Sequence, residues 1–295
     1  MIDYRYHALS LAAVLFALAL GVLLGVAIGD SNLVSSAKSG IVHNLDSEVE
    51  AARAQAAQLQ ERLAAEQAFT GGLYPLAVHE LLTGRNVGLV FLGASSDQVN
   101  AIVRTAVAQA GGSVATVVAV RVPLDLAGIA QESAGTHYAA LASSTSLIER
   151  FGEVMGRELV GGGAQVKREL LSRVRASLLS AFDGQLSRLE GLVVLRSEPT
   201  GMTAAQTEAS AAFESGLLAG VTASGVTAVG AELGGAAPSQ VPWFKSRRIS
   251  SVDDVGTLAG QAALAFALAG HHGAFGTKPT AESLLPSVAG VNSGP

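Results

Sequence analysis

Asn86–Gly93, with the sequence NVGLVFLG, decides the fold. It is a short apolar run bounded by turn residues, which is typical of a strand buried inside a parallel sheet. The next residues, 94–110, have helical periodicity, with Ser95 or Ser96 as the N-cap. A second apolar run, Val114–Val122 (VATVVAVRV), predicts another strand. This stretch of chain therefore predicts a strand–helix–strand unit.

The same alternation continues toward the C-terminus. Alternating strands and helices imply a parallel sheet covered by helices. We therefore predict an α/β fold over residues 84–270, with a Rossmann-like, mostly parallel sheet and helices on both faces. A Gly/Pro-rich tail of 271–295 shows no periodicity, so we expect it to be irregular. The further predicted strands are 192–196, 226–230 and a short one near 249–250, and the further helices are 139–160, 164–188, 204–219 and 253–270, the last beginning at Asp253 and Asp254.

Residues 8–28 read ALSLAAVLFALALGVLLGVAI and carry no charge. At about 1.5 Å per residue this run is long enough for a bilayer core of about 30 Å. A cleaved signal peptide or a buried helix are alternatives, but a single-pass transmembrane helix fits its length better. Arg5 favours a cytoplasmic N-terminus of residues 1–7, which would place the C-terminal domain outside the cytoplasm in a cell membrane or envelope.

Residues 38–69 have the apolar spacing of a coiled coil, with intervals that alternate between three and four residues. We expect a homodimer through this coil and through a small-residue face of the anchor at Gly21, Gly25 and Gly29. An amphipathic helix packed on the chain's own domain is the alternative. We expect Gly71, Gly72 and Pro75 to end the helix. The apolar seam comprises Val42, Leu45, Val49, Ala52, Ala56, Leu59 and Leu63.

The composition excludes several classes of function. The chain has no cysteine, which rules out disulfides, thiolate catalysis and iron–sulfur ligation by this chain. A net charge of −5 argues against nucleic acid as a partner. There is no Gly-x-Ser-x-Gly motif and no Walker lysine, and only Gly93 occupies the turn after the first strand. We therefore expect no enzyme activity and no resident cofactor, with an envelope enzyme as a remote alternative.

Three features are candidate binding residues. His271 and His272 lie in a Gly-rich loop and could offer two imidazoles to Cu(II), or they could simply form a polar helix end. Lys245, Arg247 and Arg248 form a basic cluster beside Trp243, which either binds an anionic lipid or polymer or is a solvated rim. The predicted helix 164–188 is basic on balance and is a candidate surface for a partner. Its charges are Lys167, Arg168, Arg173, Arg175 and Arg188 against Glu169 and Asp183.

The two ends of the chain carry a family resemblance in the residues Arg5, His7, Ser10–Leu11, Ala13–Val14, Ala17–Leu18, Gly21, Leu24–Gly25, Gly270–Gly273, Gly276, Ala281 and Leu284–Pro286. On these residues the chain resembles the actinobacterial copper transporter family (MctB-like). The resemblance implies a membrane-anchored cell-envelope protein implicated in copper transport, efflux and homeostasis, with copper as a transported ion. A related branch acts with a partner in septation, so the alternative is a non-enzymatic envelope scaffold that binds a cell-division or cell-wall protein.

Overall fold

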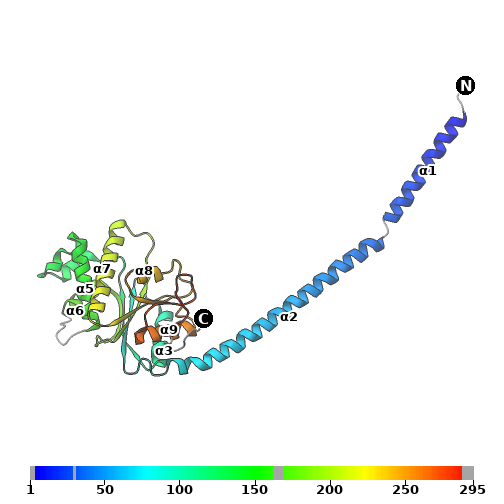
Figure 1. Cartoon of the computed structure of the whole chain (residues 1–295). Helices are drawn as coiled ribbons and strands as arrows, with labels where there is room; N and C mark the ends of the chain where they lie inside the picture. The colour runs from blue at the N-terminus through cyan, green and yellow to red at the C-terminus, as the bar shows by residue number, and fades with distance from the viewer. Residues whose placement is uncertain (1–3, 29–30, 162–168, 288–295) are drawn as a thin grey trace. The chain divides into compact units, whose positions relative to one another are not determined.

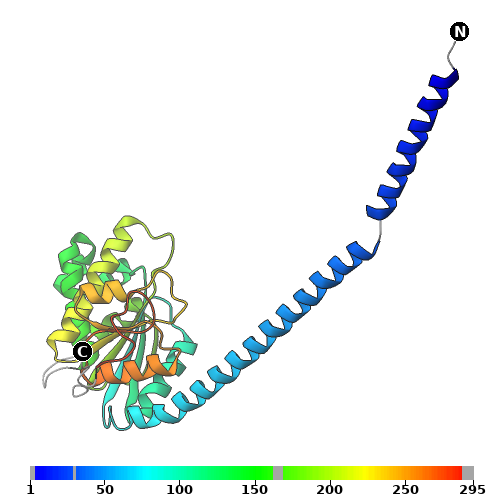
Figure 2. The same ribbon diagram turned by 45° about the vertical axis from the view of Figure 1, so that its right-hand side comes forward.

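The computed structural model describes residues 4–28, 31–161 and 169–287 (Figure 1). The chain divides into two compact units, Met1–Ala68 and Phe69–Pro295. The first unit is helical, and the second contains a sheet with its covering helices (Figures 1 and 2).

The first unit begins with the apolar helix α1, Tyr4–Ile28. Its segment Arg5–Ala27 is long and apolar enough to cross a membrane, and its side chains make no internal core. Helix α2, Ser31–Val78, follows and extends into the second unit. The predicted helix break at Gly71, Gly72 and Pro75 is wrong, because α2 continues through all three residues. Tyr74 and Val78 are buried in the core of the second unit, and this packing outweighs the local helix-breaking tendency of proline.

The second unit contains a seven-stranded sheet in the order β3-β2-β1-β4-β5-β6-β7. All neighbouring strands pair in parallel except β3, which is antiparallel to β2. The predicted α/β fold class is therefore confirmed. The strands are β1 Asn86–Leu92, β2 Ser113–Val120, β3 Leu179–Gly184, β4 Gly191–Arg196, β5 Thr227–Ala231, β6 Ser250–Val252 and β7 Ala274–Phe275.

Helices cover both faces of the sheet, with a separate apolar core on each (Figure 2). Side chains alternate across β1, because Val90 and Leu92 enter one core while Leu89 and Phe91 enter the other. The core on the Leu89 side is covered by the end of α2, by α3 and by α9. The core on the Val90 side is covered by η1 and by helices α4 to α8. The helices are α3 Asp97–Gln109, α4 Leu126–Glu132, the 3-10 helix η1 His137–Ser143, α5 Thr145–Val160, α6 Glu169–Leu178, α7 Ala204–Ala223, α8 Val241–Ser246 and α9 Leu258–Ala269.

Three predicted helices differ from the structure. The predicted single helix 139–160 is wrong, because the extended backbone of Ser144 divides it into the 3-10 helix η1 and the α-helix α5. The predicted helix 164–188 is wrong after Leu178, where the chain becomes strand β3 and pairs with β2. The predicted start of the last helix at Asp253 and Asp254 is also wrong. Helix α9 begins at Leu258, and Thr257 caps it by accepting a hydrogen bond from the Gly260 amide.

Asp253 instead holds the C-terminal tail. Its carboxylate is fully buried and accepts hydrogen bonds from the backbone N–H groups of Thr277 (3.0 Å) and Lys278 (2.6 Å). The tail also adds strand β7 beside β6, so residues 274–275 are regular rather than irregular as expected. The sheet thus includes part of the segment that follows α9.

Candidate functional site at the carboxyl edge of the sheet

The loops after β1 and β4 meet where the strand order reverses. From β1 the chain continues to β2 on one side, and from β4 it continues to β5 on the other. Gly93, with φ +115°, allows the close approach, because a Cβ there would lie 2.4 Å from the carbonyl oxygen of Ser197. The Ser197 amide also donates to the Leu92 carbonyl at 2.9 Å. Doubly wound sheets bind ligands at such a reversal point.

Two adjoining hollows open at this edge. One, of about 430 Å³, has largely apolar walls that include Phe91, Val99 and Leu195. The other, of about 560 Å³, is lined by the loop after β4 and by the segment before α8. Both share Arg196 and Ser197, so the last residue of β4 lies at the boundary between the two hollows.

Arg196 is the charged centre of this edge, with a side chain only 10% exposed. Its Nε donates to Glu214 Oε2 at 2.8 Å, and its Nη1 donates to Gln240 Oε1 at 2.8 Å. Its Nη2 donates to Glu198 at 3.2 Å, and the guanidinium lies 4.9 Å from the ring centre of Trp243. Burial raises the pKa of the Glu214 carboxyl above its usual value, and Arg196 counteracts part of that rise.

A second ion pair, with a buried carboxylate and a partly buried lysine, lies directly after β5. Glu232 Oε1 accepts from Lys278 Nζ at 2.6 Å, and the same ammonium also donates to the carbonyls of Leu233 and Ala236. The Ser239 hydroxyl donates a hydrogen bond to Glu232 Oε1 at 2.8 Å. The C-terminal tail therefore supplies one member of this edge, and its lysine neutralises the buried carboxylate.

The sequence reasoning missed Arg196 and Glu232. One signal would have found them: Arg196 ends the predicted strand 192–196, and Glu232 follows the predicted strand 226–230 by two residues, at the edge where parallel sheets place functional side chains. Of the predicted residues near Gly93, Ser96 is the N-cap of α3 and accepts from the Val99 amide at 3.3 Å, which confirms that expectation. The edge combines a guanidinium, carboxylates and hydroxyls around apolar walls, a set suited to holding a polar organic group.

The two predicted metal ligands lie at the opposite, amino edge of the sheet. His271 packs edge-on against Phe266, with ring centres 5.5 Å apart. His272 Nδ1 lies 3.5 Å from Ser250 Oγ beside a hollow of about 210 Å³. The rings thus have different neighbours, and across the described residues no group of three or more His, Cys, Asp or Glu side chains is placed to hold a metal ion. Copper binding at His271 and His272 stays a prediction.

The predicted basic cluster is divided among separate partners. Lys245 pairs with Glu282 at 2.6 Å, and this contact lowers the pKa of the Glu282 carboxyl. Arg247 lies 3.9 Å from the ring centre of Trp243 and donates to Ser215 at 3.0 Å. Two of the three cations are therefore engaged within the domain.

Comparison with known proteins places the chain in a family. The family model described as "Copper transport outer membrane protein, MctB" matches residues 1–286. Similar proteins named "Copper transporter MctB" from Mycobacterium bovis and Mycobacterium tuberculosis are each 36% identical over 118 residues. That alignment covers 40% of this chain and 37% of each relative, so it spans little more than a third of the relatives' length. Because the family model covers nearly the whole chain, and as the two ends of the sequence suggested, the chain belongs to the MctB family of copper transport outer membrane proteins.

Proposed function

We propose that this protein serves copper transport or copper homeostasis at the cell envelope, with α1 as its membrane anchor. The match of the MctB family model to residues 1–286 carries the proposal. The apolar span Arg5–Ala27 agrees with an envelope location. Copper is then a transported ion rather than a resident cofactor.

The side chains of this protein offer few ligands of the kind that Cu(I) prefers. Cu(I) prefers thiolate and thioether ligands, and this chain has no cysteine and only three methionines. We therefore propose that soft ligands for copper come from a partner, while this chain anchors and positions the assembly.

A deletion strain tests the copper role. We expect it to accumulate more cellular copper and to grow less well at raised copper than the parent. The full-length gene should restore both properties, whereas a version without residues 4–28 should not. Unchanged copper content and unchanged copper tolerance in the deletion strain would contradict the proposal.

We propose further that residues 1–7 are cytoplasmic and that the α/β domain lies outside the cytoplasm, because Arg5 lies just before the uncharged run of residues 8–28. The absence of native cysteine makes a labelling test direct. A Ser246→Cys variant should react with a membrane-impermeant maleimide on intact cells, and a His7→Cys variant should react only after lysis. The reverse pattern would overturn this topology.

An envelope scaffold is the second candidate function, and the exposed seam of α2 favours it. Leu45, Val49, Leu59 and Leu63 are 59%, 42%, 57% and 55% exposed, although large apolar side chains are normally buried. On the anchor, a Cβ added at Gly21 or Gly25 would meet no atom within 4 Å, so both positions are open to a second helix. Val42 and Gly29 lie outside the residues whose side chains are described.

The same deletion strain separates the two candidates. The scaffold predicts normal copper content with misshapen septa or altered walls. The copper role predicts raised copper content with normal septa. Expressing the seam variant Leu59→Asp in the deletion strain then shows which of the two phenotypes depends on self-association.

A further inference from the structure

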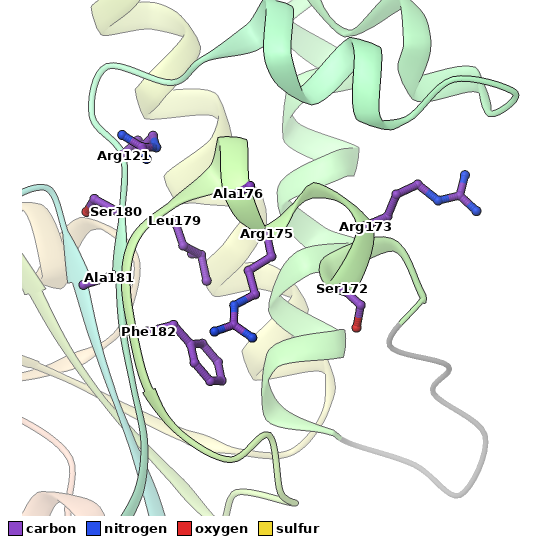
Figure 3. A pocket seen from close by; sticks show the side chains of 9 residues that line it. All are labelled: Arg121, Ser172, Arg173, Arg175, Ala176, Leu179, Ser180, Ala181 and Phe182. Carbon is purple, nitrogen blue, oxygen red and sulfur yellow. The ribbon is translucent and has the colours of Figure 1, made fainter.

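A groove lies beside the junction of α6 and β3 (Figure 3). It has a volume of about 550 Å³, and its lining includes Arg121, Arg173 and Arg175 together with the start of β3. Figure 3 shows Arg175 extending beside Phe182, whereas Arg173 points away from that ring. Lys167 and Arg168, which the sequence assigned to the same basic surface, lie outside the described residues.

Among the described residues, the arginines of the groove have no acidic partner. Within the described chain, no carboxylate lies at ion-pair distance from Arg121, Arg173 or Arg175, whereas Arg104 and Arg196 are paired. The Arg175 guanidinium lies 3.8 Å from the ring centre of Phe182, which fixes its direction along the strand. A protein of net charge −5 therefore presents a local basic groove.

The groove lies beside the open edge of the sheet. β3 is the terminal strand, and across the described residues no strand pairs with its outer edge. Ser180 and Ala181 are exposed, and the register of β3 against β2 shifts between Ala119 and Val120. The outer edge of a terminal strand offers N–H and C=O groups to another extended chain.

We propose that an extended acidic segment of a partner protein adds to the outer edge of β3 as a further strand, with its carboxylates facing Arg121 and Arg175. Backbone pairing supplies affinity in such complexes, and the side chains beside the strand supply selectivity. An anionic lipid headgroup would satisfy the arginines but not the strand edge. The juxtaposition of the two features therefore favours a peptide.

A binding experiment on the full chain in detergent micelles tests the proposal. The probe is a fluorescent peptide of about eight residues that alternates Glu with Val, and its Lys–Val counterpart is the peptide control. We expect saturable binding of the acidic peptide only, weakened by added salt. The double variant Arg121→Glu/Arg175→Glu should lose about tenfold or more in affinity, because it places like charges against the peptide. Arg150→Glu, an exposed change on α5, should leave affinity unchanged.

Hydrogen exchange distinguishes strand addition from simple charge attraction. Bound peptide should slow exchange of backbone amides within Leu179–Gly184, and the milder variant Arg175→Gln should weaken binding while keeping the wild-type melting temperature. The proposal is overturned if the acidic peptide does not bind, if binding survives the charge reversal, or if residues 179–184 gain no protection. Binding to phosphatidylglycerol vesicles, lost in the double variant and without binding of the peptide, would assign the groove to lipid instead.

Discussion

The buried hydroxyl of Tyr74 makes the stability of the α/β domain depend on pH under alkaline conditions. Its side chain is 5% exposed, and within the described residues its hydroxyl has no hydrogen-bond partner. Burial raises the pKa of Tyr74 to about 12 from 10.0. The unfolded tyrosine ionises near pH 10, whereas the folded one ionises only near pH 12. The unfolding free energy is therefore unaffected by the ionisation of Tyr74 below pH 10, and it falls as the pH rises from 10 through 12.

We predict that Tyr74→Phe removes this alkaline loss. The wild-type chain should lose about 2 kcal/mol more unfolding free energy than the variant between pH 10 and pH 12, since one pKa unit corresponds to about 1.4 kcal/mol. At neutral pH the variant should be at least as stable, because the hydroxyl makes no bond that phenylalanine would lose. Urea titrations across this pH range measure both effects, and parallel alkaline losses in the two proteins would contradict the explanation.

The Arg196 site allows a matched comparison of two carboxylates. Glu214→Ala should destabilise the domain by about 3 kcal/mol, because it leaves a buried guanidinium without its buried partner. Glu198→Ala should cost less than about 1 kcal/mol, since the Glu198 side chain is 41% exposed. Trp243 is the one tryptophan of the chain and lies beside Arg196, so its fluorescence follows unfolding. Equal losses from the two variants would show that burial does not govern this pair.

At the scale of elements, α5 and α7 pack at backbone contact. A Cβ on Gly216 would lie 1.9 Å from the carbonyl oxygen of Glu149, and one on Gly156 would lie 2.1 Å from that of Leu217. No rotamer change relieves a clash with backbone. The glycines therefore set the separation of the two helices that cover one core.

We predict that Gly216→Ala destabilises the α/β domain by about 3 kcal/mol through overpacking. Gly72→Ala is the matched control, because a Cβ there meets nothing within 4 Å on an exposed helical position. Alanine at position 72 should stabilise the helix by up to about 1 kcal/mol. Thermal unfolding measures both, and an unaffected Gly216→Ala protein would contradict the close approach.

At the scale of the whole molecule, the exposed seam of α2 predicts self-association. Leu59→Asp should lower the cross-linked dimer fraction of the full chain in micelles about tenfold, because a coiled-coil seam excludes unpaired charge. Gln60→Asp adds the same charge one residue away, off the seam, and should leave the dimer intact. If the Leu59→Asp chain were as dimeric as the wild type, the seam would not be part of the dimer interface.

The sequence by itself determined the elements whose pattern is local. The anchor helix, the strands around NVGLVFLG and the Ser96 cap follow from the spacing of apolar and capping residues, and that spacing depends only on the geometry of a helix or strand. The resemblance of the two ends to the copper transporter family was likewise available from the sequence and is confirmed.

Only the tertiary structure decided the features that depend on distant partners. β3 exists because residues 179–184 pair with β2, and α2 passes Pro75 because Tyr74 and Val78 are buried. Arg196 and Glu214 are 18 residues apart, and Glu232 and Lys278 are 46 apart, so no local pattern marks either pair. Local spacing fixes the conformation of an element, whereas its neighbours fix its burial, its charge partners and the sites that it forms.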